Sequence, residues 1–414
     1  MTPIHGPLGI EAIAGRLPDE FRALLCLDDP ERLAEALVRA DPVATLRLAK
    51  HHRLAGPLGR ALDEAGLRDR VDPQLRDDLD KVRRRTQRRY VRKARPQLQE
   101  LSAALDAVGV QPIALKGVSL VEGGWLRSDE RRFSDLDVLI SPDQLTRAAG
   151  ALSELGYRPR GGQPRLDWAR ANHYQDPPWE RGDTSLVVDL HHHIVSPRDR
   201  LAFDRSSLRS VRLVRMGSIE VHRLDDADQV DHLILHFWRD RMAGRPTALG
   251  QLWDIHRTAT ALTSAGQARL LEVSAARGHA HLVALVLSIA QLTFGTRLEA
   301  ERLGLDAWLG EPELHAFILR RVLVERPAHA QLLMPTGDVD YTAARIATRL
   351  AAQIRRPTRL LEGFYGPAGP LRLRLRHLAE IAKLLARFAG APRAGAAEIA
   401  LDRWVHGLGA PRPK

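Results

Sequence analysis

The chain of 414 residues is long enough for two or three domains, and its 44% hydrophobic and 27% charged residues are ordinary for a protein with a hydrophobic core. Its single cysteine, Cys26, excludes a disulfide framework and a cysteine-rich zinc site, and it fits a reducing cytoplasm. The formal net charge of +11 would suit a polyanionic partner. However, nearly all basic residues are arginines and only six are lysines, so part of this charge reflects composition.

Neither a signal peptide nor a membrane span is expected. Asp19, Glu20 and Arg22 follow soon after a start rich in Pro and Gly, which differs from a signal peptide. The longest apolar stretch, residues 281–294, is too short to cross a bilayer and contains polar side chains. We therefore expect a buried helix there, a cytoplasmic location and no membrane partner.

Helical spacing dominates the N-terminal part of the chain. Between residues 31 and 67, apolar residues recur every three or four positions, with breaks at Asp41-Pro42 and Gly56-Pro57. This pattern predicts about three short amphipathic helices packed as a bundle. Residues 81–95 continue as a strongly basic helix, with charges all round it and Tyr90 as its only aromatic residue. This helix could form a nucleic-acid groove, but a solvated helix is the favoured interpretation.

The pattern then changes to alternating strands and helices. Short apolar runs predict three strands, at residues 111–115, 133–140 and 186–194. Residues 145–155 predict a helix that ends at Gly156. Such alternation marks an α/β module that differs from its helical flanks. From residue 225 onward the periodicity is helical again, and His236 there has the spacing of a packed core residue.

The first chemical motif is Ile113-Ala-Leu-Lys-Gly117, an expected strand that runs into a glycine at the start of a helix. A glycine at this point lets the backbone approach a phosphate closely, and the free N–H groups of a helix N-terminus attract anions. Lys116 adds a point charge suited to phosphate oxygens, and it stands out because lysine is rare in this chain. Lys116 and Gly117 are therefore candidate phosphate-binding residues.

The second motif is Ser134-Asp135-Leu136-Asp137, within the second expected strand. Residues two apart on a strand point the same way, so both carboxylates project from one face while apolar neighbours bury the other. Two such carboxylates repel each other unless a cation lies between them, and Mg²⁺ prefers a few carboxylates together with substrate phosphates. Asp135 and Asp137 are thus candidate ligands of Mg²⁺, or of Mn²⁺ in its place.

The third motif is Val187-Val-Asp-Leu-His191, in which Asp189 and His191 share one strand face. If this strand lies beside that of Asp135 and Asp137, three carboxylates converge. A two-metal or metal-plus-base site for attack on an α-phosphate would follow. A lone Asp-x-Asp is weak evidence, because solvated aspartates at a strand end give the same pattern. The ordered set of Lys-Gly, Asp-x-Asp and a strand aspartate is much more specific.

Other polar residues near these motifs are each open to two interpretations. Arg131 and Arg132 could reach the β- and γ-phosphates, or they could be exposed loop arginines. Ser134 could contact phosphate or cap its strand. His191 could orient a carboxylate or touch substrate. His173, in a loop rich in Pro and Trp, could border the acceptor pocket, although packing of the loop is the alternative.

Residues 100–195 closely resemble the uncharacterised nucleotidyltransferase family of bacteria, within the polymerase-β-type nucleotidyltransferase superfamily. The motifs that carry the resemblance are Leu115-Lys-Gly-Val-Ser-Leu, Arg131-Arg-Phe-Ser-Asp-Leu-Asp-Val-Leu-Ile, Leu155-Gly-Tyr157 and Val188-Asp-Leu-His191. It extends more loosely to residues 46–62 and 231–256. The resemblance implies a small mixed sheet and Mg²⁺ held by Asp135 and Asp137, with Asp189 as third carboxylate. The superfamily usually carries Gly-Ser where this chain has Lys116-Gly117, a departure that is typical of the resembled family itself.

We therefore expect an α/β (α+β) nucleotidyltransferase core with a small mixed sheet, flanked by all-helical regions. The core is expected at residues 101–222, between an N-terminal helical bundle at 1–100 and a C-terminal helical domain at 223–390. Residues 391–414 are expected to form a linker and a C-terminal tail.

The expected reaction moves an NMP group from an NTP such as ATP to an acceptor hydroxyl and releases pyrophosphate, with Asp189 helping to activate the acceptor. The acceptor could be a small molecule, a peptide or RNA, although nucleic acid is not favoured. Two alternatives stay open. One is a catalytically inactive nucleotide-binding or regulatory protein, and the other is a tRNA-modifying nucleotidyltransferase or toxin.

Overall fold

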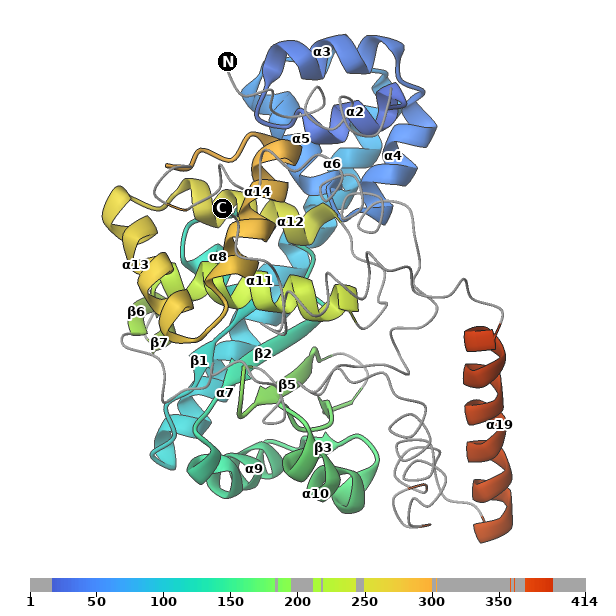
Figure 1. The fold of residues 1–414 in the computed structure, drawn as a ribbon, viewed down its shortest axis with the longest axis vertical. Helices are drawn as coiled ribbons and strands as arrows, with labels where there is room; N and C mark the ends of the chain where they lie inside the picture. Colours follow the sequence, from blue (N-terminus) through green and yellow to red (C-terminus); the bar gives the residue numbers. More distant parts are fainter. Residues whose placement is uncertain are drawn as a thin grey trace, which may run out of the picture.

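A computed structural model describes residues 17–182, 185–194, 211–216, 219–242, 249–299, 303, 358, 361 and 369–389. The linker and tail expected at residues 391–414 lie outside this set. A seven-stranded mixed sheet forms the centre of the fold, and helices pack around it (Figure 1). The predicted fold class, an α/β core with a small mixed sheet and helical flanks, is confirmed.

A series of short helices precedes the sheet. They are α2 (Asp19–Leu25), α3 (Pro30–Arg39), α4 (Pro42–His51), α5 (Ala55–Glu64), α6 (Pro73–Arg89) and α7 (Arg95–Ala107). The helices α3, α4 and α6 each begin with a proline after an aspartate, and the aspartate side chain accepts a backbone N–H of the first turn. These Asp-Pro pairs define the helix starts. The three or so short helices predicted between residues 31 and 67 are confirmed as α3 to α5.

The basic segment follows one helical path, as predicted, with a π-helical turn at Tyr90–Ala94 between α6 and α7. Arg89 points back onto the chain and donates a hydrogen bond to the carbonyl of Phe133. The Tyr90 ring is buried, with its centroid 5.0 Å from that of Phe133. The only aromatic residue of this segment therefore packs inside the protein and cannot stack on a nucleic-acid base.

The sheet has the strand order β3-β4-β5-β2-β1-β7-β6. Its strands are β1 (Ile113–Ala114), β2 (Asp135–Leu139), β3 (Arg158–Pro159), β4 (Trp179–Glu180), β5 (Val187–His191), β6 (Val211–Met216) and β7 (Ile219–Leu224). Strand β2 pairs parallel with β5 and antiparallel with β1. The three predicted strands are confirmed as β1, β2 and β5. The other four strands were not predicted.

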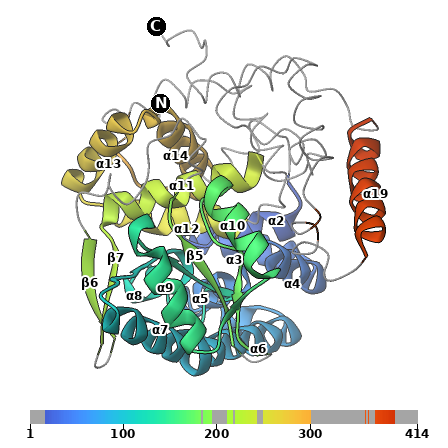
Figure 2. The same ribbon diagram turned by 90° about the horizontal axis from the view of Figure 1, so that it is seen from below.

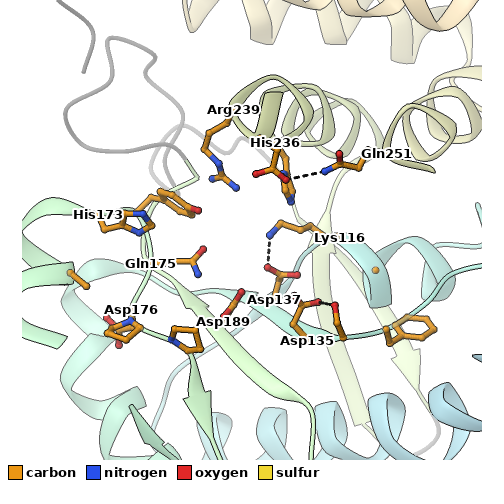
Figure 3. Close-up of a pocket in the computed structure, with 18 of the residues that line it drawn as sticks. Lys116, Asp135, Asp137, His173, Gln175, Asp176, Asp189, His236, Arg239 and Gln251 are labelled. Carbon is orange, nitrogen blue, oxygen red and sulfur yellow. Dashed lines mark hydrogen bonds and ion pairs between the residues drawn. The ribbon is translucent and has the colours of Figure 1, made fainter. Parts of the chain in front are cut away.

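The two faces of the central strands carry different side chains. One face is apolar and packs on α7 and on α9 (Leu145–Glu154), with Leu136, Val138 and Ile140 all buried as predicted. The opposite face carries Asp135 and Asp137 and looks toward α11 (Asp226–Met242) (Figure 3). The alternation of side chains along the strand, which the sequence shows, thus places the carboxylates on one face and the apolar side chains on the other.

The remaining helices are α8 (Lys116–Glu122), α10 (Gly162–Asn172), α12 (Leu249–Thr260), α13 (Ser264–Ala276), α14 (Ala280–Phe294) and α19 (Pro370–Ala389). In α14 every residue from 282 to 294 is buried, which confirms the buried helix predicted there. Side chains of α11 to α14 share one hydrophobic cluster with those of α2 to α6, whereas α19 stands to the side (Figure 2). No helix in the described ranges has the length and apolar run needed to cross a membrane.

Candidate active site

A cavity of about 630 Å³ lies between the carboxylate face of the sheet and the helices α10, α11 and α12. The carboxylates of Asp135, Asp137 and Asp189 lie on one side of it, and His236 and Arg239 face them from α11 (Figure 3). Every site residue predicted from the sequence except His191 lines this cavity, namely Lys116, Gly117, Arg131, Arg132, Ser134, Asp135, Asp137, His173 and Asp189.

The strand register brings the carboxylates together. Strands β2 and β5 are parallel neighbours, with Asp135 opposite Val187 and Asp137 opposite Asp189. Side chains of directly opposed residues on neighbouring strands point to the same face of a sheet. Asp137 and Asp189 therefore lie side by side in the cavity, as the sequence predicted on the condition that the two strands are neighbours.

Asp137 forms a buried ion pair with Lys116. Its Oδ1 accepts a hydrogen bond from Nζ of Lys116 at 2.5 Å, and both residues are under 10% exposed. Burial alone would raise the pKa of Asp137, but the Lys116 ammonium and His191 outweigh burial and lower it. Burial likewise opposes the charge on Lys116, yet Asp137 raises the Lys116 pKa overall. Each charge is held in the interior by the other.

His191 lies behind Asp137 and does not line the cavity. Its Nε2 is 3.0 Å from Oδ1 of Asp137, and the side chain is 1% exposed. Burial and the Lys116 charge lower the His191 pKa to about 4, so the ring is neutral and donates Nε2–H to the carboxylate. Of the two interpretations of His191, the geometry supports orientation of a carboxylate and does not support contact with substrate.

The negative charge of Asp189 is less well compensated than that of Asp137. Burial and the charge of Asp137 raise its pKa to about 7. Its Oδ1 is buried and has no hydrogen-bond partner in the described part of the protein. Burial and Asp137 also raise the pKa of Asp135, which accepts a hydrogen bond from the Ser134 hydroxyl at 3.1 Å. A cation near Asp135 and Asp189 would relieve this arrangement.

The carboxylates of Asp135, Asp137 and Asp189 fit a hard divalent ion whose other ligands are substrate phosphates and water. Mg²⁺ is usually held by one or two carboxylates and substrate phosphates rather than by a cage of protein ligands. Among the described residues, no three His, Cys, Asp or Glu side chains are grouped so that they could hold a metal ion by themselves. The Oδ1 atom of Asp189 is buried without a hydrogen-bond partner in the described residues, and a bound cation would compensate its charge.

Backbone strain is concentrated at the cavity. Among the described residues, Arg53 (φ 60°) and Lys116 (φ 47°) are the two non-glycine residues with positive φ, and both line the cavity. This conformation costs a residue with a side chain roughly 1 kcal/mol or more, and it tends to occur at functional sites. Glycine would adopt such a φ freely, whereas Lys116 adopts it with a side chain.

The two adjacent loop arginines differ in their surroundings. Arg131 forms an ion pair with Asp254 of α12, with an Nη1–Oδ2 distance of 2.8 Å. Arg132 is exposed at the cavity and forms no ion pair within the described ranges. Its guanidinium is therefore the better placed of the two for a ligand.

Several cavity residues were not selected from the sequence. Arg53 lies between α4 and α5, exposed to the cavity and without an ion-pair partner in the described part of the chain. The Arg239 guanidinium lies 4.0 Å from the ring centroid of Tyr174, whose ring is 4.1 Å from that of His173. His236, interpreted as a core residue, is mostly buried but also lines the cavity. The looser resemblance at residues 46–62 and 231–256 was the signal that could have found Arg53, His236 and Arg239.

Comparison with protein families identifies this fold. The family model described as Uncharacterised nucleotidyltransferase matches residues 39–295, which is more than half of the chain and includes every cavity residue. Comparison with curated proteins gives no match, and comparison with solved structures gives none. On the family match, the chain belongs to the uncharacterised nucleotidyltransferase family.

Proposed function

We propose that this protein transfers an NMP group from an NTP, such as ATP, to an acceptor hydroxyl in a reaction that depends on Mg²⁺ or Mn²⁺. Membership of a nucleotidyltransferase family supports nucleotide transfer in general. The observation that carries the proposal is the β2–β5 register, which sets Asp137 beside Asp189 in a cavity with a basic wall.

The carboxylate set of Asp135, Asp137 and Asp189 would hold the divalent ion. When bound, such an ion supplies positive charge to the triphosphate and to the charge that develops at the α-phosphate. The protein supplies the placement, because β2 and β5 fix these side chains on a rigid sheet and His191 holds Asp137 from behind.

The triphosphate would lie along the basic wall of the cavity. Arg132 and Arg53 offer guanidinium groups that have no ion-pair partner within the described ranges, and Lys116 adds charge next to the carboxylates. The amide of Gly117 would face a phosphate. A Cβ on Gly117 would lie 3.5 Å from the Phe133 ring, an ordinary contact, so packing does not require glycine there. A glycine at this position would instead allow a phosphate to approach the backbone closely.

The chemical step would be an in-line attack. The acceptor oxygen bonds to the α-phosphorus, the bond from that phosphorus to the bridging oxygen of the β-phosphate breaks, and pyrophosphate leaves. Asp189 would take the hydroxyl proton. His173, on the α10 side of the cavity, would border the acceptor.

A direct test follows pyrophosphate release from a panel of NTPs with cell lysate as the source of acceptor. Wild type should release pyrophosphate only with a divalent ion, and Asp135→Ala with Asp137→Ala should release none. Unchanged release by that double variant would contradict the proposal. The rival, a nucleotide-binding protein without catalytic activity, would bind NTP and Mg²⁺ in calorimetry but release no pyrophosphate in this assay.

A further inference from the structure

The carboxylate cluster already contains one cation of its own. The Lys116 ammonium lies 2.5 Å from Oδ1 of Asp137, and its side chain points toward that carboxylate (Figure 3). A buried ammonium at this distance does for Asp137 what a metal ion would otherwise do, because it cancels the charge of that carboxylate.

The contact atom on Asp137 is also fully engaged. Its Oδ1 accepts from Nζ of Lys116 and from Nε2 of His191, and a carboxylate oxygen has about two lone-pair directions to offer. A divalent ion at the same oxygen would displace one of these donors. It would also lie close to the Lys116 ammonium, and the two cations would repel each other.

The backbone holds Lys116 in this position. The N–H of Leu115 donates to the carbonyl of Asp137 at 2.9 Å, so the residue before Lys116 is joined directly to the residue that the lysine neutralises. Lys116 also keeps a positive φ of 47° although glycine would adopt it without strain. Lys116 therefore has a strained backbone at the position from which its ammonium pairs with Asp137.

Asp189 presents the opposite case, because its buried Oδ1 has no hydrogen-bond partner within the described ranges. Asp135 lies on the same face of β2 as Asp137, and its carboxylate contacts the Ser134 hydroxyl. Asp135, Asp189 and the second oxygen of Asp137, Oδ2, therefore remain available to a metal ion.

Building on the proposed function, we propose that Lys116 is a built-in second cation. Its ammonium stays on Oδ1 of Asp137 when nucleotide binds, and the carboxylate set of Asp135, Asp137 and Asp189 takes one divalent ion, where a three-carboxylate site could take two. Lys116 is thus the residue that sets the metal stoichiometry of the site.

The test counts bound Mn²⁺ by electron paramagnetic resonance, with protein in excess over an NTP analogue that has a methylene group between its α- and β-phosphates. Wild type should bind one Mn²⁺ per nucleotide complex. Lys116→Gly, which suits the positive φ, should bind two, with the second ion at least tenfold tighter than in wild type. Lys116→Arg keeps a cation and should still bind one.

Two Mn²⁺ ions in wild type would overturn this inference alone, and so would a single ion in a folded Lys116→Gly protein. Absence of Mn²⁺ uptake with nucleotide by every protein would overturn the proposed function as well. The wild-type count decides the matter even if Lys116→Gly does not fold, because it needs no variant.

Discussion

Asp137 on β2 and Asp189 on β5 are register partners on neighbouring parallel strands, and both carboxylates line the same cavity. Asp137 is paired with the Lys116 ammonium, whereas Asp189 has a buried oxygen without a hydrogen-bond partner in the described residues. Burial and the charge of Asp137 raise the Asp189 pKa to about 7. The pair is therefore asymmetric, and the protein alone leaves the ionised form of Asp189 poorly stabilised.

This asymmetry predicts a pH-dependent effect of Asp189→Asn on stability in metal-free buffer. An unfolded aspartate titrates near 4 and folded Asp189 near 7, so the folded protein binds more protons between these values. The stability contributed by this group is full at low pH and falls as the pH rises from about 4 to about 7. At pH 8 the variant should exceed wild type in free energy of unfolding by about 2–4 kcal/mol.

Urea denaturation at a series of pH values measures this difference, which should vanish near pH 4. Asp106→Asn, at an exposed position on α7, is the control and should differ little from wild type at any pH. A difference between Asp189→Asn and wild type that does not change with pH would contradict the assigned environment of Asp189.

Arg53→Gly should weaken NTP binding about tenfold, because it removes a charge-assisted contact of about 1–2 kcal/mol to phosphate. Glycine adopts the φ of 60° at this position without strain, so the free energy of unfolding should be equal to that of wild type or higher. Calorimetry with an NTP and with the matching nucleoside measures the effect, which should appear for the NTP alone. Lys50→Ala removes a nearby exposed charge outside the cavity and should leave both affinities unchanged. Equal losses for the nucleoside and the NTP would argue against a phosphate contact.

Gly250→Ala should destabilise the protein by about 1–3 kcal/mol and weaken NTP binding as well. A Cβ on Gly250 would lie 2.9 Å from the His52 carbonyl oxygen and 3.0 Å from Cβ of Arg53, so the turn that carries Arg53 must move. Gly150→Ala is the matched control, because its Cβ would meet nothing within 4 Å on helix α9. That control should stabilise the protein by about 0.5–1 kcal/mol. Thermal unfolding followed by circular dichroism compares them, and equal effects would refute the predicted clash.

The sequence predicted the parts of the site that local patterns encode. Alternation around Asp135 and Asp137 indicated a strand with one apolar face, and the run ending at His191 indicated a second strand. Their pairing could only be stated as a condition, since strand neighbours depend on long-range packing. The short strands β3 and β4 have two residues each, too few to show a period.

The contacts that give the site its character join residues far apart in the chain. The ion pair of Lys116 with Asp137 and the entry of Arg53 into the cavity depend on tertiary packing, which spacing does not reveal. Strands β6 and β7 are a different case. Each begins with alternating apolar and polar residues, but the alternation breaks at Leu213-Val214 and at His222-Arg223, so the local pattern is too short to predict a strand.

The central claim is transfer of an NMP group, and comparison of two radiolabels tests it most directly. Protein, lysate and Mg²⁺ are incubated with NTP labelled at the α-phosphate or at the γ-phosphate. The account predicts that the α-label enters an acceptor with wild type and with Asp106→Asn, that Asp135→Asn abolishes this transfer, and that the γ-label leaves as pyrophosphate. Transfer of the γ-label to the acceptor, or equal α-label transfer by wild type and Asp135→Asn, would contradict it.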